Sequence, residues 1–94
     1  MTVRELYAEL DRRIPRTLSC PWDNDGLLCC PDGQREVKRV LITLDVTARA
    51  VEHAIENGYD CIVSHHPFIF KGLKAIDEEG DISAKVVRLI CEGI

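Results

Sequence analysis

Two short β-favouring runs, separated by one helix-length segment, set the strongest limit on how this chain can fold. Residues 40–44 form a near-continuous apolar run, which is typical of a strand buried on both faces, and residues 59–64 predict a second, short strand. Between them, Thr47 can cap a helix of about ten residues. Gly58 is placed to end that helix in a left-handed conformation. A strand, helix and strand in this order form a βαβ unit with parallel strands.

The segment before this unit predicts a helix and then a loop. Thr2 and Glu5 have capping-box spacing, and the apolar pattern that follows predicts a helix over residues 3–13, stopped at Pro15. Residues 15–36 are rich in Pro, Gly and Asn, so we expect a loop there, with a short strand over residues 27–30.

The segment after the unit predicts one more helix. Ser83 can cap it, and Gly93 can stop it. Its inward positions are expected to be Val86, Val87, Leu89 and Ile90. The fold class is therefore α/β, a βαβ-containing layered fold with a mixed or parallel sheet flanked by helices.

Chain length allows one domain at most, because 94 residues build only a modest core. In a βαβα pattern the residue after a helix-stopping glycine usually opens the next strand, and here that residue is Ile94. We therefore expect residues 1–94 to be a single domain or, more specifically, the N-terminal portion of a larger domain.

Composition excludes several classes of protein. The net charge is −4 with acidic and basic residues interspersed, whereas nucleic-acid binding calls for a basic stripe. No apolar segment approaches the roughly 20 residues that a membrane span needs, and the first residues lack a signal-peptide layout, so we expect a cytoplasmic protein.

Five cysteines, an odd number without C-x-x-C spacing, are expected to be core or half-buried thiols in a reducing compartment. Two alternatives stay open for Cys29 and Cys30, which are adjacent in sequence: a zinc site and a thiol-based sensor.

His65 and His66 follow the second strand directly and form the one adjacent pair of histidines in the chain. Parallel strands end at the same sheet edge, so Asp45, which closes the first strand, is expected near this pair. Adjacent strand residues point to opposite faces, and the pair therefore suits two ions better than one. Zinc, iron, manganese or nickel would fit imidazole and carboxylate. The alternative is a polar loop, with Asp45 favouring the following helix N-terminus.

A second candidate cluster is Trp22 with Asp23, inside a segment rich in turn residues. The turn interpretation is favoured, with Trp22 covering the small core. The alternative is a cleft with an aromatic wall and one polar group.

Four blocks of the sequence together resemble one family, and the resemblance covers essentially the whole chain. The chain resembles the N-terminal part of the GTP cyclohydrolase 1 type 2 homologues, also called the Nif-three-like family. The blocks, in order, are Pro21–Leu27, Val40–Thr47, Glu56–Asp60 and Ile62–Phe70.

The resemblance implies a dinuclear centre of two divalent metal ions (zinc, iron or manganese), with His65 and His66 as ligands of different ions. It also implies toroidal homohexamers of the full-length protein. The remaining ligands expected from the family are an aspartate after the next strand and a histidine and glutamate near the C-terminus, and none of them matches a residue here. We expect Asp45, Trp22 and Asp23 to line the cleft or to contact the metal-binding side chains without binding the metal themselves.

The function that follows is a metal-dependent hydrolase of a nucleotide-like small substrate, with this 94-residue portion inactive alone. The alternative is a non-enzymatic metal-binding regulatory or protein-interaction module.

Overall fold

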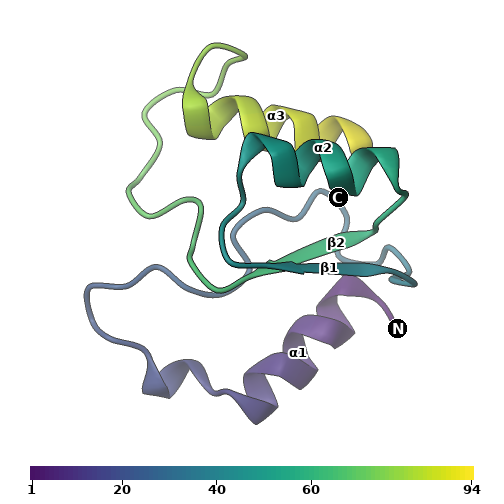
Figure 1. Ribbon diagram of the computed structural model, residues 1–94. Helices are drawn as coiled ribbons and strands as arrows, with labels where there is room; N and C mark the ends of the chain where they lie inside the picture. Colours follow the sequence, from purple (N-terminus) through teal and green to yellow (C-terminus); the bar gives the residue numbers. More distant parts are fainter.

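Two parallel strands and the helix between them form the centre of the fold (Figure 1). The computed structural model describes all residues from 1 to 94, with β1 at Val40–Thr43, α2 at Ala48–Glu56 and β2 at Cys61–Ser64. In the register, Val40 lies opposite Cys61 and Thr43 opposite Ser64. The predicted βαβ unit and the α/β class are therefore confirmed.

The ends of α2 follow from two local signals. Thr47 adopts an extended backbone, and its Oγ1 accepts a hydrogen bond from the Ala50 N–H at 3.0 Å, which satisfies one of the helix's free N-terminal donors. At the other end Gly58 has φ of +66°, a conformation that favours glycine because it has no Cβ. Both predicted boundary residues are confirmed.

α1 spans Val3–Arg13 and lies on the opposite side of the sheet from α2 (Figure 1). Its capping box is complete, because Glu5 N donates to Thr2 Oγ1 at 3.2 Å and Thr2 N donates to Glu5 Oε2 at 2.8 Å. A short 3₁₀ helix, η1 at Arg16–Leu18, follows Pro15. The predicted first helix is confirmed with its bounds.

α3 spans Asp81–Glu92 and packs beside α2 (Figure 1). The predicted cap at Ser83 is wrong: Ser83 lies inside the helix, 4% exposed, and its hydroxyl donates to the Asp77 carbonyl at 2.9 Å. The N-cap is Gly80, whose N–H donates to Asp77 Oδ1, so the turn before the helix supplies the start. Gly93 ends the helix with φ of +71°, as predicted, but Ile90 is 49% exposed and does not point inward.

Two other predictions need correction. Residues 27–30 form no strand, since none of their backbone groups takes part in a backbone hydrogen bond and a strand requires a partner. The strand β1 is not buried on both faces either. Ile42 is 80% exposed because α1, α2 and α3 leave that part of the strand uncovered.

The core is small and lies between the sheet and the two neighbouring helices. Seven of 94 residues are buried, so each buried contact carries a large share of the stability. Val46, Val51 and Leu89 form the centre, with Ile62 and Phe68 packed against them. No helix combines the length and the apolar character that crossing a bilayer requires.

Candidate metal centre

The two adjacent histidines extend the strand pairing past the end of β2. The His65 N–H donates to the Thr43 carbonyl and the His66 N–H to the Leu44 carbonyl, both at 3.0 Å. The Ser64 hydroxyl donates to the His66 carbonyl at 2.8 Å. These bonds fix the backbone of both histidines at the carboxyl edge of the parallel pair, the edge where open α/β sheets bind ligands.

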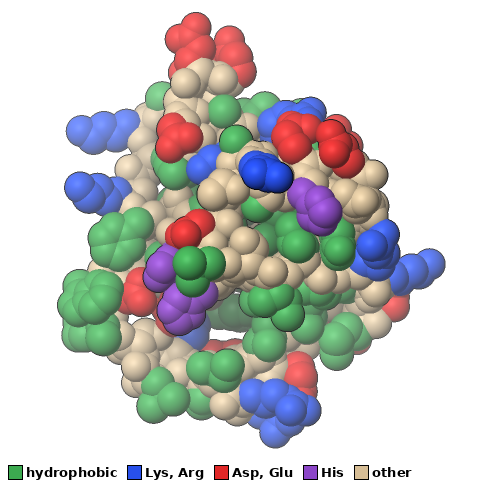
Figure 2. Space-filling model, in the orientation of Figure 1, with side chains coloured by type: hydrophobic (Ala, Val, Ile, Leu, Met, Phe, Trp, Pro, Cys, Tyr) green, Lys and Arg blue, Asp and Glu red, His purple; other side chains and the backbone are tan.

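The imidazole rings of His65 and His66 lie side by side, with centroids 4.8 Å apart and planes inclined by 54°. Ideal strand alternation would place them on opposite faces, so the chain departs from regular strand geometry at this point. Both side chains are exposed, and Figure 2 shows two histidines together on the surface next to acidic groups. Both imidazoles are thus exposed to solvent at the same edge of the sheet, and we term this edge, with His65 and His66, the histidine rim.

Asp45 joins this rim from the end of β1. Its Oδ1 lies 2.9 Å from His66 Nδ1, and both side chains are about half exposed, at 54% and 56%. When Nδ1 carries the proton, it donates to the carboxylate and the Nε2 lone pair is left for a metal ion. A carboxylate in this position orients a ligating histidine and raises its basicity. The expected approach of Asp45 and the histidine pair is confirmed.

The donor set at the rim is incomplete for a tight metal site. No three side chains among His, Cys, Asp and Glu converge so as to hold one ion. Zinc-type sites use three or four protein ligands, so the two imidazoles fit the chemistry of a divalent transition metal but provide only part of its shell.

A cavity of about 210 Å³ opens beside His65, between α1, the loop of residues 23–32 and β2. Most of its lining is apolar. The polar groups include Asp23, Ser64 and His65, so the structure places the predicted Asp23 at the same cavity as one histidine. An apolar cavity with a few polar groups is the usual form of a small-molecule site.

Trp22 lies elsewhere than predicted. It is 70% exposed and does not cover the core; its ring packs at a 60° tilt against Phe70, with centroids 6.5 Å apart. The turn interpretation of this segment is confirmed, since Asp23 N donates to the Cys20 carbonyl at 3.0 Å. The Asn24 side-chain amide donates to the Ile69 carbonyl and ties this loop to the segment after the histidines.

Three of the five cysteines lie at the same cavity as His65. Cys29, Cys30 and Cys61 line the cavity, and burial raises the pKa of the Cys29 and Cys61 thiols. A raised pKa keeps a thiol protonated and unreactive, which argues against a sensor at Cys29. All five cysteines are free thiols.

Two residues that the sequence did not single out make contacts with the segments around the site. Asn24 was interpreted as part of a turn, and its contact with Ile69 depends on how two loops meet. Lys85 was not singled out, because a lysine on a helix carries no signal of its own; in the structure it lines a groove with His66.

Comparison with known proteins relates the whole chain to one family. The model of the family Duf34/NIF3 (NGG1p interacting factor 3) matches residues 1–94. A protein of Staphylococcus aureus (strain Mu50) named "GTP cyclohydrolase 1 type 2 homolog" is 45% identical over 80 residues, which is 85% of this chain. A Staphylococcus epidermidis protein of the same name is 41% identical over 80 residues. The chain spans about a fifth of these relatives, 22% of each.

Solved structures agree with this relation. A crystal structure of a Staphylococcus aureus protein superposes with a TM-score of 0.92 at 40% identity, covering 100% of this chain and 30% of the other. A Bacillus cereus protein described as related to NIF3 gives 0.89 at 32% identity, covering all of this chain and 26% of the other. Reduced HcgD from Methanocaldococcus jannaschii gives 0.89 at 26% identity, with 100% and 37% covered.

Proposed function

This chain belongs to the Duf34/NIF3 family, and on that premise we propose that it supplies His65 and His66 to a centre of two divalent metal ions in a hydrolase. In this proposal each histidine binds a different ion, and zinc, iron or manganese occupies the centre. The remaining ligands come from other parts of a longer protein, because this chain spans 22% of the relatives' length.

One observation carries the proposal: two imidazoles lie 4.8 Å apart at the carboxyl edge of a parallel strand pair, and one of them is held by a carboxylate. Two-metal hydrolases place their ions roughly 3.5–4 Å apart. Two neighbouring imidazoles can each bind one ion of such a pair. The contact between Asp45 and His66 adds the outer support that metal-binding histidines almost always have.

The chemistry divides between the metal ions and this chain. Bound divalent ions lower the pKa of a coordinated water and thereby supply a nucleophile for hydrolysis. Asp45 holds the ring of His66 in one orientation, and the adjacent cavity, with Asp23 at its polar side, receives part of a small substrate. We propose a nucleotide-like substrate, in keeping with the name printed for the relatives, "GTP cyclohydrolase 1 type 2 homolog".

Metal content tests the proposal directly. A longer protein that contains this chain together with the remaining ligands is purified and analysed by elemental mass spectrometry, and its His65→Ala, His66→Ala double variant is compared with His53→Ala. His53 is an exposed histidine on α2 and serves as the matched control. In this longer protein we expect about two transition-metal ions per chain in the wild type and in the control, and near-background content in the double variant. Equal metal content in all three proteins would refute the assignment.

The assembly and location expected from the resemblance remain proposals. We propose that the full-length protein is a cytoplasmic homohexamer, and sedimentation velocity of the purified full-length protein measures its assembly state. One experiment distinguishes the non-enzymatic alternative from the hydrolase. A protein-interaction module would retain partner binding after both histidines are replaced.

A further inference from the structure

The cavity beside β2 has the position and the surroundings of a further strand of the sheet. All residues of β2, from Cys61 to Ser64, line it. Successive residues of a strand point to opposite faces of the sheet, so a cavity that all of them line lies at the edge of the strand and not on one face. The sheet consists of β1 and β2 alone, so this edge of β2 has no strand partner.

Two layers of helix enclose this edge, as they enclose a buried strand. Leu6 and Leu10 of α1 line the cavity, and so does Leu89 of α3. In Figure 1, α1 lies on one side of the two strands and α3 on the other. Most of the lining is apolar, and a strand that is covered on both faces has apolar side chains at successive positions. The cavity therefore fits an apolar strand.

The loop segment of residues 27–30 also lines the cavity, and its backbone groups take part in no backbone hydrogen bond. This loop runs against the direction of β2. Asn24 bonds Ile69, which follows the end of β2, whereas Arg35 bonds Asp60, which precedes its start. A strand parallel to β2 in the cavity would therefore lie antiparallel to residues 27–30. It would satisfy backbone groups on both sides, as buried backbone groups require.

The end of α3 leads into the cavity. Gly93 ends the helix with φ of +71°, and Ile94 lines the cavity and packs against the core at Leu89. α2 and α3 lie side by side on the same side of the sheet (Figure 1). Crossovers between parallel strands are almost always right-handed, so a second crossover over this face continues in the direction from β1 past β2. The relatives extend beyond the matched part, since this chain spans 22% of their length.

From these observations we infer that, in the full-length protein, the segment after Ile94 forms a strand in this cavity, parallel to β2. It pairs with β2 on one side and with residues 27–30 on the other, and residues 27–30 thereby become the antiparallel edge strand of a mixed sheet. The added strand lies beside Cys61 and Ile62 and leaves the polar end of the cavity, with Asp23 and His65, to the substrate. The inference does not depend on the metal centre, because the pairing involves backbone groups.

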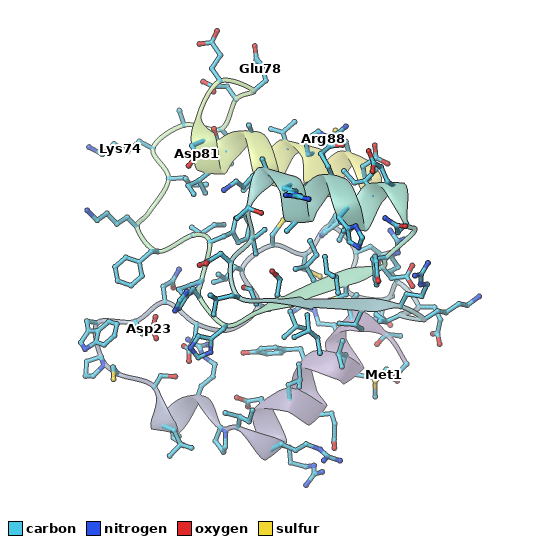
Figure 3. The ribbon with its side chains drawn as sticks, in the orientation of Figure 1. Met1, Asp23, Lys74, Glu78, Asp81 and Arg88 are labelled. Carbon is cyan, nitrogen blue, oxygen red and sulfur yellow. The ribbon has the colours of Figure 1, made fainter.

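Hydrogen exchange of single amides, measured by NMR on the full-length protein, tests the inference. An edge strand directs every second N–H group to its neighbour and the others to solvent. Within residues 27–30 we therefore expect alternate amides to exchange at least about 100-fold more slowly than those between them. The amide of Lys74, on the exposed loop before α3, is the matched control and should exchange at nearly the unprotected rate (Figure 3). Scalar couplings across the hydrogen bonds identify the acceptor carbonyls, which we expect in the segment after Ile94.

Three results would overturn the inference. The first is fast exchange at every amide of residues 27–30. The second is slow exchange without alternation, which indicates coverage by another part of the protein and not strand pairing. The third is coupling to carbonyls outside the segment after Ile94. Metal content of the same sample is measured separately, so a metal-free protein with the alternating pattern would refute the proposed metal centre and support the strand.

Discussion

Replacing Asp60 by asparagine is expected to destabilise the fold by about 2 kcal/mol, because Asp60 joins the starts of both strands. Its Oδ2 accepts the backbone N–H groups of Lys38 and Arg39 at 2.8 and 2.9 Å, and its Oδ1 accepts Arg35 Nη2 at 3.0 Å. The side chain is 17% exposed. The contacts hold β1 and β2 in the register that brings Asp45 to His66.

The magnitude follows from what asparagine can retain. Its single carbonyl oxygen can still accept from the two backbone amides, but its NH₂ group then faces the Arg35 guanidinium and that bond is lost. Hydrogen bonds to charged groups contribute about 1.5–3 kcal/mol and neutral ones about 1 kcal/mol, so one loss and two weakened bonds give about 2–3 kcal/mol before solvent screening. In a domain of this size, 2 kcal/mol lowers the Tm by about 8–16 °C.

Acid dependence provides a second measure of the same contacts. The backbone hydrogen bonds from Lys38 and Arg39, with a smaller contribution from Arg35, lower the pKa of Asp60 in the folded protein. A lowered pKa contributes stability above the unfolded value of about 3.9, and this contribution is lost as the pH falls through the folded value. The difference in Tm between wild type and Asp60→Asn should therefore shrink below about pH 4.

Thermal unfolding followed by circular dichroism between pH 3 and 7 measures both effects. Glu78→Gln is the control, because it removes one carboxylate from the exposed loop before α3 and should change stability by less than about 0.5 kcal/mol (Figure 3). A Tm for Asp60→Asn within about 2 °C of the wild type at pH 7, or a difference that grows in acid, would refute the reasoning.

Two further predictions concern the site and the thiols. Asp45→Asn should weaken metal binding by about 10–100-fold, because it removes the carboxylate that orients His66; competition with a chelator measures this, and unchanged affinity would contradict the role of Asp45. Alkylation at pH 8 should modify the exposed Cys20 at least about tenfold faster than Cys61, whose burial raises the pKa of its thiol. Peptide mass spectrometry after timed quenching gives the two rates, and equal rates would contradict the burial of Cys61.

The central unit was predictable because its signals are local. Thr47 caps α2 and Gly58 ends it through the conformations of single residues, and the strands on either side have β-favouring runs of their own. The prediction for Ser83 was wrong because it also relied on a local signal. Serine is a common helix cap, but the start of α3 is set by Asp77 in the preceding turn. A local pattern cannot tell which of two polar residues a turn will use.

Only the part of the candidate site that follows from the parallel strand pairing could be predicted from the sequence. Parallel pairing alone brings Asp45 to the histidines, since both follow the carboxyl ends of neighbouring strands. The contact of Asn24 with Ile69 and the position of Lys85 beside the groove of His66 depend on the path of irregular segments, which have no periodicity. Such contacts come from tertiary packing and could not be derived from the sequence.

The uncovered part of β1 has a consequence for purification. Ile42 and Leu44 are 80% and 60% exposed, and β1 has a strand neighbour on one side only. An open strand edge with large aliphatic side chains favours self-association, so we expect samples at high concentration to contain several aggregation states. A metal-to-protein ratio averaged over such a mixture describes none of its species. Stoichiometry is therefore best measured on single peaks separated by size.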